Sequence, residues 1–396
     1  MVPHPQADKR KIVFLFSDTG GGHRSACEAI IEAINLEFPG QFDTEMVDIF
    51  RQYAPRPLDM APNIYPTLSR MPEVWRLGYR ASDGKRRTRA LTRLFWPYVR
   101  RSLTRLVLEH PCDLLVSVHQ LSNAPFARVL QELEKIGHPH TPFAIVVTDM
   151  VSTHAFWYDN RARLVIVPTE AARRRGIEAG LDSGKIRVVG MPVGERFAAP
   201  LESRATLREK LGWAQDRLAV LMVGGGEGMG PLEPMAEAAD EAGLPISIAV
   251  IAGRNQKLRE RLEGRRWQTP HHIYGFVKNM PELMGAADVL VTKAGPGTIS
   301  EAFIAGLPIL LYSRMPGQED GNVRYVVQQG AGAWTPEPER MAAVLREWVE
   351  HPEKLHAAAA ASRRLAHPHA SREIARLLVE QIDPVKLSRS NRTESV

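Results

Sequence analysis

The chain has 396 residues, of which 44% are apolar and 24% charged, so it can bury the cores of two ordinary domains. Its formal net charge of +6 favours an anionic substrate or surface as partner. Two cysteines, Cys27 and Cys112, exclude a disulfide framework and predict reduced thiols. No apolar run has transmembrane length, and residues 1–10 lack the apolar core of a signal peptide. We therefore expect a soluble or peripheral cytoplasmic protein.

The first strand-like run leads into a glycine-rich turn. Residues 12–16 predict a buried strand, and residues 25–36 carry apolar side chains at helical spacing. Between them, the motif 17–24 (SDTGGGHR) places three glycines and His23 at a helix N-terminus, where a ligand can approach the backbone. The motif matches neither the P-loop nor the dinucleotide fingerprint. An ordinary turn with a surface histidine stays open, as does a dehydrogenase whose ribose-binding acid is Asp48.

Strand-like runs alternate with helical patterns along most of the chain. The first set comprises 12–16, 45–49, 114–119, 143–148, 164–168 and 187–190, and the second 219–223, 246–251, 272–274, 289–292 and 308–312. This alternation is typical of parallel sheets covered by helices on both faces, and predicts two doubly wound α/β domains. The Gly- and Pro-rich stretch 190–200 predicts the linker. The expected domains are 1–195 and 196–366, followed by a C-terminal helix and disordered tail over 367–396.

One segment, residues 53–105, interrupts this alternation. It is rich in proline and then interleaves large aromatic side chains, Trp96 among them, with basic ones. Aromatic rings at headgroup depth and cations facing anionic lipid predict a membrane-facing surface. Nucleic-acid binding and an ordinary solvated face remain alternatives.

Three loops that follow strands of the second set carry glycines, amides and carboxylates. They are 222–230, 293–298 (KAGPGT) and 317–322 (GQEDGN). Backbone N–H groups after Gly295 can hold a diphosphate, and Glu301, one turn into the helix, can accept hydrogen bonds from a ribose. Each loop alone is more often a plain turn, but three at successive strand ends favour one ligand site. The sequence has no Asp-x-Asp pair or His/Cys cluster, so we prefer a site without a metal.

Together, the motifs 17–24, 224–231 and 293–302 resemble the monogalactosyldiacylglycerol synthases, and 147–149, 251–255 and 317–323 fit as well. The resemblance runs from about residue 11 to about residue 366. It implies a GT-B fold, with two Rossmann-like doubly wound domains facing an interdomain cleft. The wider relatives are the diacylglycerol glucosyltransferases and the enzyme that adds N-acetylglucosamine to lipid-linked muramyl peptide.

The implied reaction is an inverting transfer of a hexose, most simply galactose, from a UDP-sugar to the 3-hydroxyl of 1,2-diacylglycerol. The C-terminal domain would hold the UDP-hexose and the N-terminal domain the lipid, at an anionic membrane surface and without nucleic acid. We expect no metal or other cofactor. Glucose as donor sugar, another lipid acceptor, and a non-catalytic nucleotide- or lipid-binding protein stay open. The expected location is cytoplasmic, at the inner face of the membrane, without the targeting extension of the plant members.

The resemblance also implies roles for individual residues. His23 matches the proposed general base, since a neutral imidazole at a positive helix end can take a proton from an alcohol, and Asp149 is the second catalytic candidate. The implied donor-binding residues are Gly225, Gly226, Glu227, Arg254, Phe276, Val277, Gly295, Pro296, Gly297, Thr298, Glu301, Gln318, Glu319 and Asn322. The implied acceptor-binding residues are Gly21, Gly22, His119 and His154, and the membrane-facing ones are Arg86, Arg87, Arg89, Arg93 and Trp96. One departure is His119-Gln120-Leu121, where plant-type members have His-Pro-Leu.

Overall fold

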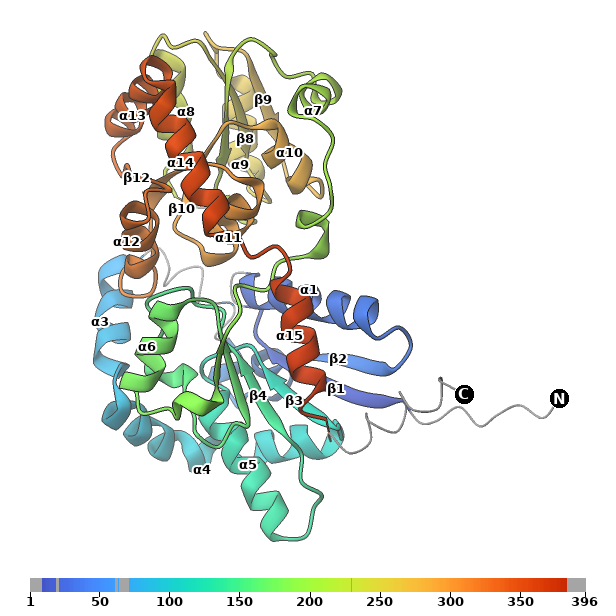
Figure 1. The fold of residues 1–396 in the computed structure, drawn as a ribbon. Helices are drawn as coiled ribbons and strands as arrows, with labels where there is room; N and C mark the ends of the chain where they lie inside the picture. The colour runs from blue at the N-terminus through green and yellow to red at the C-terminus, as the bar shows by residue number, and fades with distance from the viewer. Residues whose placement is uncertain (1–8, 19–20, 61–62, 64–70, 229, 383–396) are drawn as a thin grey trace, which may run out of the picture. The chain divides into compact units, whose positions relative to one another are not determined.

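The computed structural model describes residues 9–18, 21–60, 63, 71–228 and 230–382. The chain divides into two compact units (Figure 1). The first comprises Met1–Glu195 together with His369–Val396, and the second Arg196–Pro368.

The first unit is built on a six-stranded sheet in the order β2-β1-β3-β4-β5-β6, in which every neighbouring pair is parallel. Its strands are β1 (Arg10–Phe16), β2 (Phe42–Asp48), β3 (Leu114–Ser117), β4 (Phe143–Val146), β5 (Leu164–Val167) and β6 (Ile186–Val188). The first set of expected strands is confirmed, with ends that shift by up to three residues.

Alternate side chains of β1 enter two separate cores. Ile12, Phe14 and Phe16 pack with α1 (Gly22–Glu37) and with α15 (Ala370–Val379). Val13 and Leu15 face the opposite side, which is covered by α4 (Lys85–Glu109), α5 (Asn123–Lys135) and α6 (Glu170–Glu178). A strand buried on both faces needs apolar residues at every position, which explains the unbroken run in the sequence.

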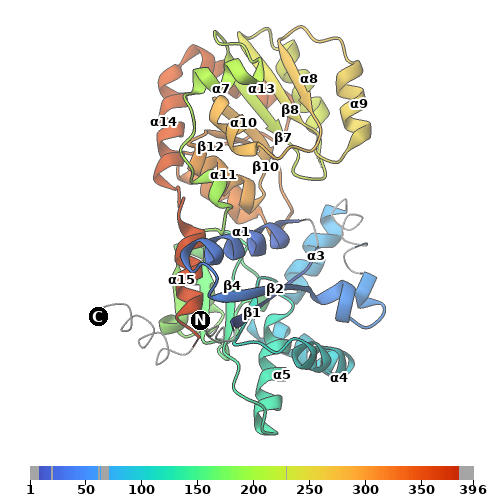
Figure 2. The same ribbon diagram turned by 90° about the vertical axis from the view of Figure 1, so that its right-hand side faces the viewer.

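The C-terminal helix α15 belongs to the first unit, a placement that the sequence analysis did not foresee. It lies beside α1 (Figures 1 and 2), and Ile374 and Leu378 are fully buried in the shared core. The Ser371 hydroxyl donates to the Val193 carbonyl (2.7 Å) and accepts from the Val193 N–H (3.0 Å). The Arg376 guanidinium pairs with Glu37 at the end of α1 (2.6 Å). The first unit is therefore formed by two segments of the chain, one before and one after the second unit.

In its described part, the segment 53–105 forms the short helix η2 (Leu58–Met60) and two α-helices, α3 (Pro72–Ser82) and most of the 25-residue α4. Residues 61–62 and 64–70 lie outside the described residues. The prediction that the Trp96 ring faces a membrane is wrong in this structure. Trp96 is only 6% exposed, lies in the core beneath α4, and carries the Arg128 guanidinium 4.2 Å above its ring. Within the described residues, no helix has the length and apolar character needed to cross a membrane.

The second unit repeats the architecture with the strand order β12-β11-β10-β7-β8-β9, again parallel throughout. Its strands are β7 (Leu218–Val223), β8 (Ile246–Ile251), β9 (His271–Tyr274), β10 (Val289–Lys293), β11 (Ile309–Ser313) and β12 (Gly332–Trp334). Its helices are α7 (Arg204–Leu211), α8 (Leu232–Glu241), α9 (Gln256–Gly264), α10 (Met280–Ala286), α11 (Pro296–Ala305), α12 (Asp320–Gln328), α13 (Pro338–Glu350) and α14 (Pro352–Arg364). The expected second set of strands is confirmed.

The edge strand β12 escaped the sequence analysis because three residues are too few to show an alternating pattern. Gly332 pairs with Ile309, and a Cβ at this position would lie 1.8 Å from the Ile309 carbonyl oxygen. Glycine is therefore required by the close approach of the two strands.

The docking of α15 predicts a stability effect. Ile374→Ala removes a fully buried side chain and should lower the free energy of unfolding of the first unit by about 2–5 kcal/mol. Denaturant unfolding with a spectroscopic probe in the first unit measures this loss. The matched control is the exposed neighbour Glu373→Ala, which should stay within about 0.5 kcal/mol of wild type. Equal effects of the two substitutions would show that α15 does not stabilise the unit.

Candidate active site

The glycine turn after β1 opens directly into α1. Gly21 is the residue before the helix and has a φ of 78°, a left-handed conformation that glycine adopts without strain. Among the described residues, a Cβ built on Gly21 or Gly22 meets no heavy atom within 4 Å, and no side chain caps the helix start. Thr19 and Gly20, also part of the motif, lie outside the described residues. The turn thus has backbone N–H groups and open space in front of them.

His23 lies one residue into α1 and contacts the ends of two neighbouring strands. Its Nδ1 is 3.0 Å from the Thr148 hydroxyl, just beyond β4, and its ring meets the edge of the His119 ring at 4.8 Å, just beyond β3. Burial lowers the pKa of His23 from 6.5 to about 4, and a hydrogen bond to the Val118 backbone opposes this only in part. The imidazole is therefore neutral near pH 7. The sequence analysis attributed this to the helix end, whereas burial is the larger cause.

Asp149 follows Thr148 at the same strand end. Its carboxylate is buried and accepts a hydrogen bond of 2.6 Å from the Trp157 indole N–H. The Trp157 ring centre is in turn 6.3 Å from that of His23. The structure therefore brings both catalytic candidates, His23 and Asp149, to one edge of the first sheet. Their chemical roles stay predictions.

The two histidines expected to bind the acceptor, His119 and His154, are both buried but differ in their surroundings. His119 accepts a hydrogen bond from the Leu121 N–H at Nδ1 (3.3 Å), which leaves the proton of the neutral ring on Nε2. Burial, with a smaller effect from His23, lowers the pKa of His119 well below its usual value. His119 thus forms one wall of the His23 environment.

His154 has both ring nitrogens engaged. Nδ1 accepts from the Phe156 N–H (3.1 Å), and Nε2 lies 3.2 Å from the Ser82 hydroxyl at the end of α3. It caps the short helix η3 (Ala155–Trp157) and stacks on the Phe156 ring. This arrangement ties η3 to α3, and acceptor binding by His154 stays a prediction.

In the second unit, the loop after β7 and the residues after β9 converge on Arg254, which follows β8. Its guanidinium pairs with Glu227 (2.7 Å) and lies 4.5 Å above the centre of the exposed Phe276 ring, which Val277 follows. The Arg254 N–H also donates to the Gly226 carbonyl at 2.8 Å. Gly225, with a φ of 74°, allows the turn that brings Glu227 here. Met229 of the same motif lies outside the described residues.

The loop after β10 begins α11 and has the features of an anion-binding helix start. Gly295 precedes the helix, Pro296 and Gly297 begin it, and Thr298 follows; the first turn contains no acid and no side-chain cap in the described structure. Such a start offers free N–H groups and the positive end of the helix dipole. Farther along α11, burial raises the pKa of Glu301 to about 7, while Arg196 counteracts the shift.

The loop after β11 is held mainly by its own polar side chains. Glu319 accepts from the Met315 N–H (2.6 Å), and Asn322 donates to the Ala294 carbonyl (2.9 Å), which links this loop to the one after β10. The buried Oδ1 of Asn322 has no partner among the described residues. Gln318 lies between the two parts of the loop. The structure thus brings the loop after β11 and the predicted diphosphate loop after β10 together.

Comparisons with known proteins match both halves of the chain. The family model for monogalactosyldiacylglycerol synthase matches residues 23–193, and that for the glycosyltransferase family 28 C-terminal domain matches residues 220–376. A probable chloroplastic monogalactosyldiacylglycerol synthase of Nicotiana tabacum is 36% identical over 372 residues, which are 91% of this chain and 69% of the relative. The chain belongs to the monogalactosyldiacylglycerol synthase family. Monogalactosyldiacylglycerol synthase 2 of Arabidopsis thaliana is 34% identical, with 98% and 84% covered.

Two further facts set the scope of the family match. The chain spans only 65% of the length of the Glycine max relative and 66% of synthase 1 of Arabidopsis thaliana. Solved structures share the fold at low identity: Acinetobacter baumannii MurG has a TM-score of 0.58 at 14% identity, with 93% of this chain and 99% of that chain covered. Anabaena HepE in complex with UDP and glucose has a TM-score of 0.55 at 16% identity, with 94% and 100% covered. The predicted GT-B fold is confirmed.

The predicted cytoplasmic location at the inner face of a membrane is wrong, because the relatives of this family are described as chloroplastic. The prediction depended on two reduced cysteines and on the lack of an apolar span. Both features report on redox state and on membrane crossing, and neither distinguishes one reducing compartment from another.

The dehydrogenase alternative also loses its candidate residue. Asp48 accepts hydrogen bonds from the Phe50 and Arg51 N–H groups at the start of η1 (Ile49–Tyr53), and from the Asp18 N–H. These bonds commit the buried carboxylate to the corner between β2 and η1, so it does not face a ribose.

One residue beside the candidate donor loops, Lys293, was not among the site residues expected from the sequence. Within the described residues, the Lys293 ammonium at the end of β10 has no hydrogen bond or ion pair. A Cβ built on Gly225 would lie 3.2 Å from Lys293 Cε, and one built on Gly295 would lie 3.7 Å from Nζ. The half-buried cation thus lies beside both glycine turns. Its position directly before the glycine loop is the sequence signal that could have identified it.

The burial of His23 predicts an unusual titration. In histidine-labelled protein followed by NMR, the His23 ring should stay neutral between pH 6 and 8 and titrate with a midpoint of about 4. His23→Gln assigns the resonance, and near-UV circular dichroism at each pH value controls for unfolding. A midpoint near 6.5, the usual value for an exposed imidazole, would mean that the ring is solvated.

Proposed function

We propose that the chain is a UDP-galactose:1,2-diacylglycerol 3-β-galactosyltransferase that makes monogalactosyldiacylglycerol. The observation that carries this proposal is the match of both halves of the chain to the family models, in a structure where His23 is neutral and beside an open glycine turn. The structural neighbour HepE of Anabaena was solved in complex with UDP-glucose, which supports a UDP-sugar as the donor.

The proposed step forms a bond between the 3-hydroxyl oxygen of diacylglycerol and C1 of the sugar, while the bond from C1 to the UDP oxygen breaks on the opposite face. His23 takes the hydroxyl proton, and UDP leaves with the electron pair. The buried ring is a weaker base than free imidazole, but the hydroxyl becomes strongly acidic as its oxygen bonds to carbon. A weak, neutral base is therefore sufficient.

The negative charge that develops on the leaving UDP needs fixed positive partners. The N–H groups at the start of α11 can supply them, and so can the Lys293 ammonium, which has no partner among the described residues. We therefore invoke no metal in this step. Among the described residues, no group of three His, Cys, Asp or Glu side chains is arranged to hold one.

We also propose that α4 faces an anionic membrane surface. The four arginines expected from the sequence are exposed on this helix, namely Arg86, Arg87, Arg89 and Arg93. Its exposed apolar side chains are Leu94 (71% exposed) and Phe95 (48% exposed), whereas Trp96 is buried. Cations draw a protein to anionic lipid, and exposed apolar side chains enter the headgroup region.

The function is tested by incubating purified protein with diacylglycerol and UDP-galactose, and separately with UDP-glucose. We expect monogalactosyldiacylglycerol from the first incubation. His23→Ala should lower turnover by roughly a hundredfold or more, the usual scale for a lost general base, without changing UDP affinity. Product from UDP-glucose alone would make the chain a glucosyltransferase, and no product from either donor would contradict an enzyme. A loss below about tenfold in His23→Ala would transfer the base role to Asp149.

Donor binding is tested on Lys293. Lys293→Met should weaken UDP binding by about tenfold or more, as expected when a charge-assisted contact of about 1.5–3 kcal/mol is lost. Calorimetry with UDP measures the affinity. The matched control is Lys257→Met, which removes an exposed cation from α9 of the same unit and should leave the affinity unchanged. Glu301→Gln should also weaken binding severalfold if its carboxylate contacts the ribose. Unchanged affinity in Lys293→Met would put the diphosphate elsewhere.

A further inference from the structure

The contact between His23 and Thr148 has no part in the transfer step described above. The His23 Nδ1 atom lies 3.0 Å from the Thr148 hydroxyl oxygen, two residues beyond the end of β4. Thr148 is only 5% exposed, and its hydroxyl has no other hydrogen bond within the described residues. A buried hydroxyl whose single partner is the candidate base can act on the chemistry of that base.

The chemistry of a neutral imidazole depends on which nitrogen holds its proton. Such a ring has one N–H and one unprotonated nitrogen, and only the latter can take a proton from an alcohol. The hydrogen bond to the Val118 backbone raises the pKa of His23, so the Val118 carbonyl accepts it from the ring N–H. Val118 is fully buried. The ring proton therefore points into the protein.

The His23 ring has an enclosed side and an open side. Thr148 lies at Nδ1, and the edge of the His119 ring is 4.8 Å away between ring centres. His23 itself is partly exposed, and a Cβ built on Gly21 or Gly22 directly before it meets no heavy atom of the described structure within 4 Å. An acceptor hydroxyl can thus reach the ring from the glycine turn, on the side away from Thr148.

The Thr148 hydroxyl is held in a fixed position. The N–H of the preceding residue, Val147, donates to the Ile166 carbonyl of the neighbouring strand β5 at 2.9 Å, which anchors the backbone to the sheet. Threonine is branched at Cβ, which restricts rotation about χ1. A fixed hydroxyl can hold the imidazole in one orientation and with one nitrogen protonated.

The partner of Nδ1 is an uncharged group. A catalytic imidazole is often oriented by a carboxylate, whose negative charge raises the pKa of the ring. The carboxylate next to Thr148 in the sequence, Asp149, accepts a hydrogen bond of 2.6 Å from the Trp157 indole N–H. A hydroxyl at Nδ1 orients the ring without adding a charge, so the ring stays neutral near pH 7.

We propose that Thr148 is a positioning residue, whose hydroxyl oxygen accepts the proton of His23 Nδ1 and so keeps Nε2 as the unprotonated nitrogen. The inference rests on the proposed role of His23 as general base. In the transfer step, the proton moves from the acceptor hydroxyl to Nε2, and the ring becomes an imidazolium. The hydrogen bond from Nδ1 to Thr148 remains, and Thr148 neither gains nor loses a proton.

Three variants separate positioning from a general loss of structure. Thr148→Val keeps the shape of the side chain but removes the hydroxyl, and Thr148→Ser restores a hydroxyl. The matched control is Thr153→Val, because Thr153 is equally buried (2% exposed) and its hydroxyl contacts the Tyr158 hydroxyl at 2.5 Å. Thermal unfolding checks that each variant is folded.

The protonated nitrogen is identified by nitrogen NMR of histidine-labelled protein at pH 7, with His23→Gln to assign the resonances. We expect a protonated Nδ1 and an unprotonated Nε2 in wild type and in Thr153→Val. Thr148→Val should shift the ring towards the form with the proton on Nε2, and Thr148→Ser should behave as wild type. A protonated Nε2 in wild type, or no change in Thr148→Val, would overturn the proposal.

Kinetics gives an independent test with diacylglycerol and UDP-galactose. Thr148→Val should lower kcat by about tenfold, the scale of one lost hydrogen bond, and leave KM for UDP-galactose unchanged. Thr148→Ser should recover most of this loss, and Thr153→Val should stay within about twofold of wild type. Equal losses in the two valine variants would show a structural role and contradict positioning. If wild type makes no product, the proposed function fails, and the NMR result alone decides whether Thr148 holds the Nδ1 proton.

Discussion

Every strand of both sheets runs in the same direction as its neighbours, and this constraint organises all that the protein does. A chain that leaves a parallel strand at its carboxyl end must return through a crossover before it can form the next strand. All strand-to-helix turns of one unit therefore lie at one edge of its sheet. In the first unit, β1, β3 and β4 are adjacent, so His23, His119 and Thr148 meet there although His23 and Thr148 are 125 residues apart in the chain. In the second unit, β10, β7 and β8 are adjacent, and Lys293, Gly225 and Arg254 meet in the same way.

Burial sets the protonation states at both sites, with opposite consequences for acids and bases. It lowers the pKa of His23 to about 4, which keeps the ring neutral, and raises the pKa of Glu301 to about 7, which brings a carboxyl into its titration range near neutral pH. Asp320 shows the contrasting case, since hydrogen bonds from Arg314 and from the Gly317 N–H hold its pKa below the usual value despite partial burial. The surroundings of each side chain beside the glycine turns thus determine whether it is charged or neutral at neutral pH.

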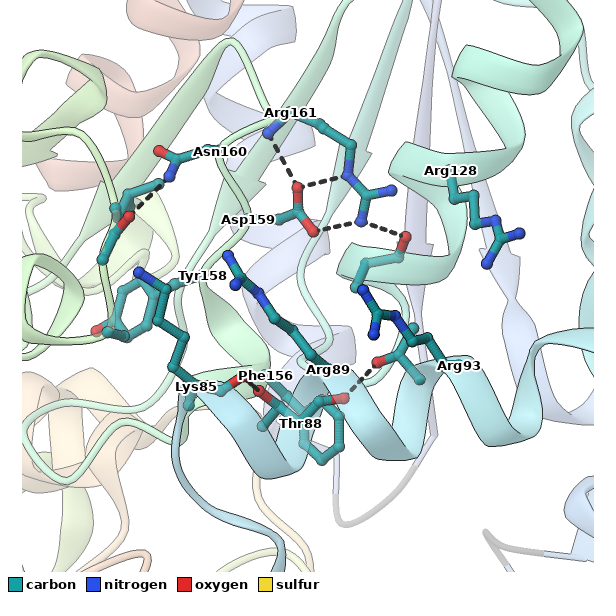
Figure 3. A pocket seen from close by; sticks show the side chains of 16 residues that line it. Lys85, Thr88, Arg89, Arg93, Arg128, Phe156, Tyr158, Asp159, Asn160 and Arg161 are labelled. Atoms are coloured by element: carbon teal, nitrogen blue, oxygen red, sulfur yellow. Dashed lines mark hydrogen bonds and ion pairs between the residues drawn. The ribbon is translucent and has the colours of Figure 1, made fainter.

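The helix α4 shows how one element serves two environments. Its inner face carries Trp96, Leu103 and Leu106 into the core, while Arg86 and Arg87, two of the arginines that the sequence analysis associated with a membrane, are exposed on it. Lys85, Arg89 and Arg93, also exposed on this helix, border a polar cavity that residues of the segment 155–161 line as well (Figure 3). Consecutive residues of a helix point to different faces, because each turn has 3.6 residues. A helix with a buried face and a basic face therefore shows aromatic and basic residues interleaved in its sequence.

The sequence by itself determined the strands, the two α/β domains and the glycine turns, because buried parallel strands need unbroken apolar runs and sharp turns need glycine. The motif 17–24 and the loops after β7, β10 and β11 were recognisable for this reason. Tertiary structure alone decided the order of the strands, and hence which loops meet, since parallel pairing partners leave no local pattern. It also decided that Trp96 points inward, that α15 packs on α1, and that His154 is engaged at both nitrogens. Each of these depends on contacts between residues far apart in the chain, where local spacing contains no information.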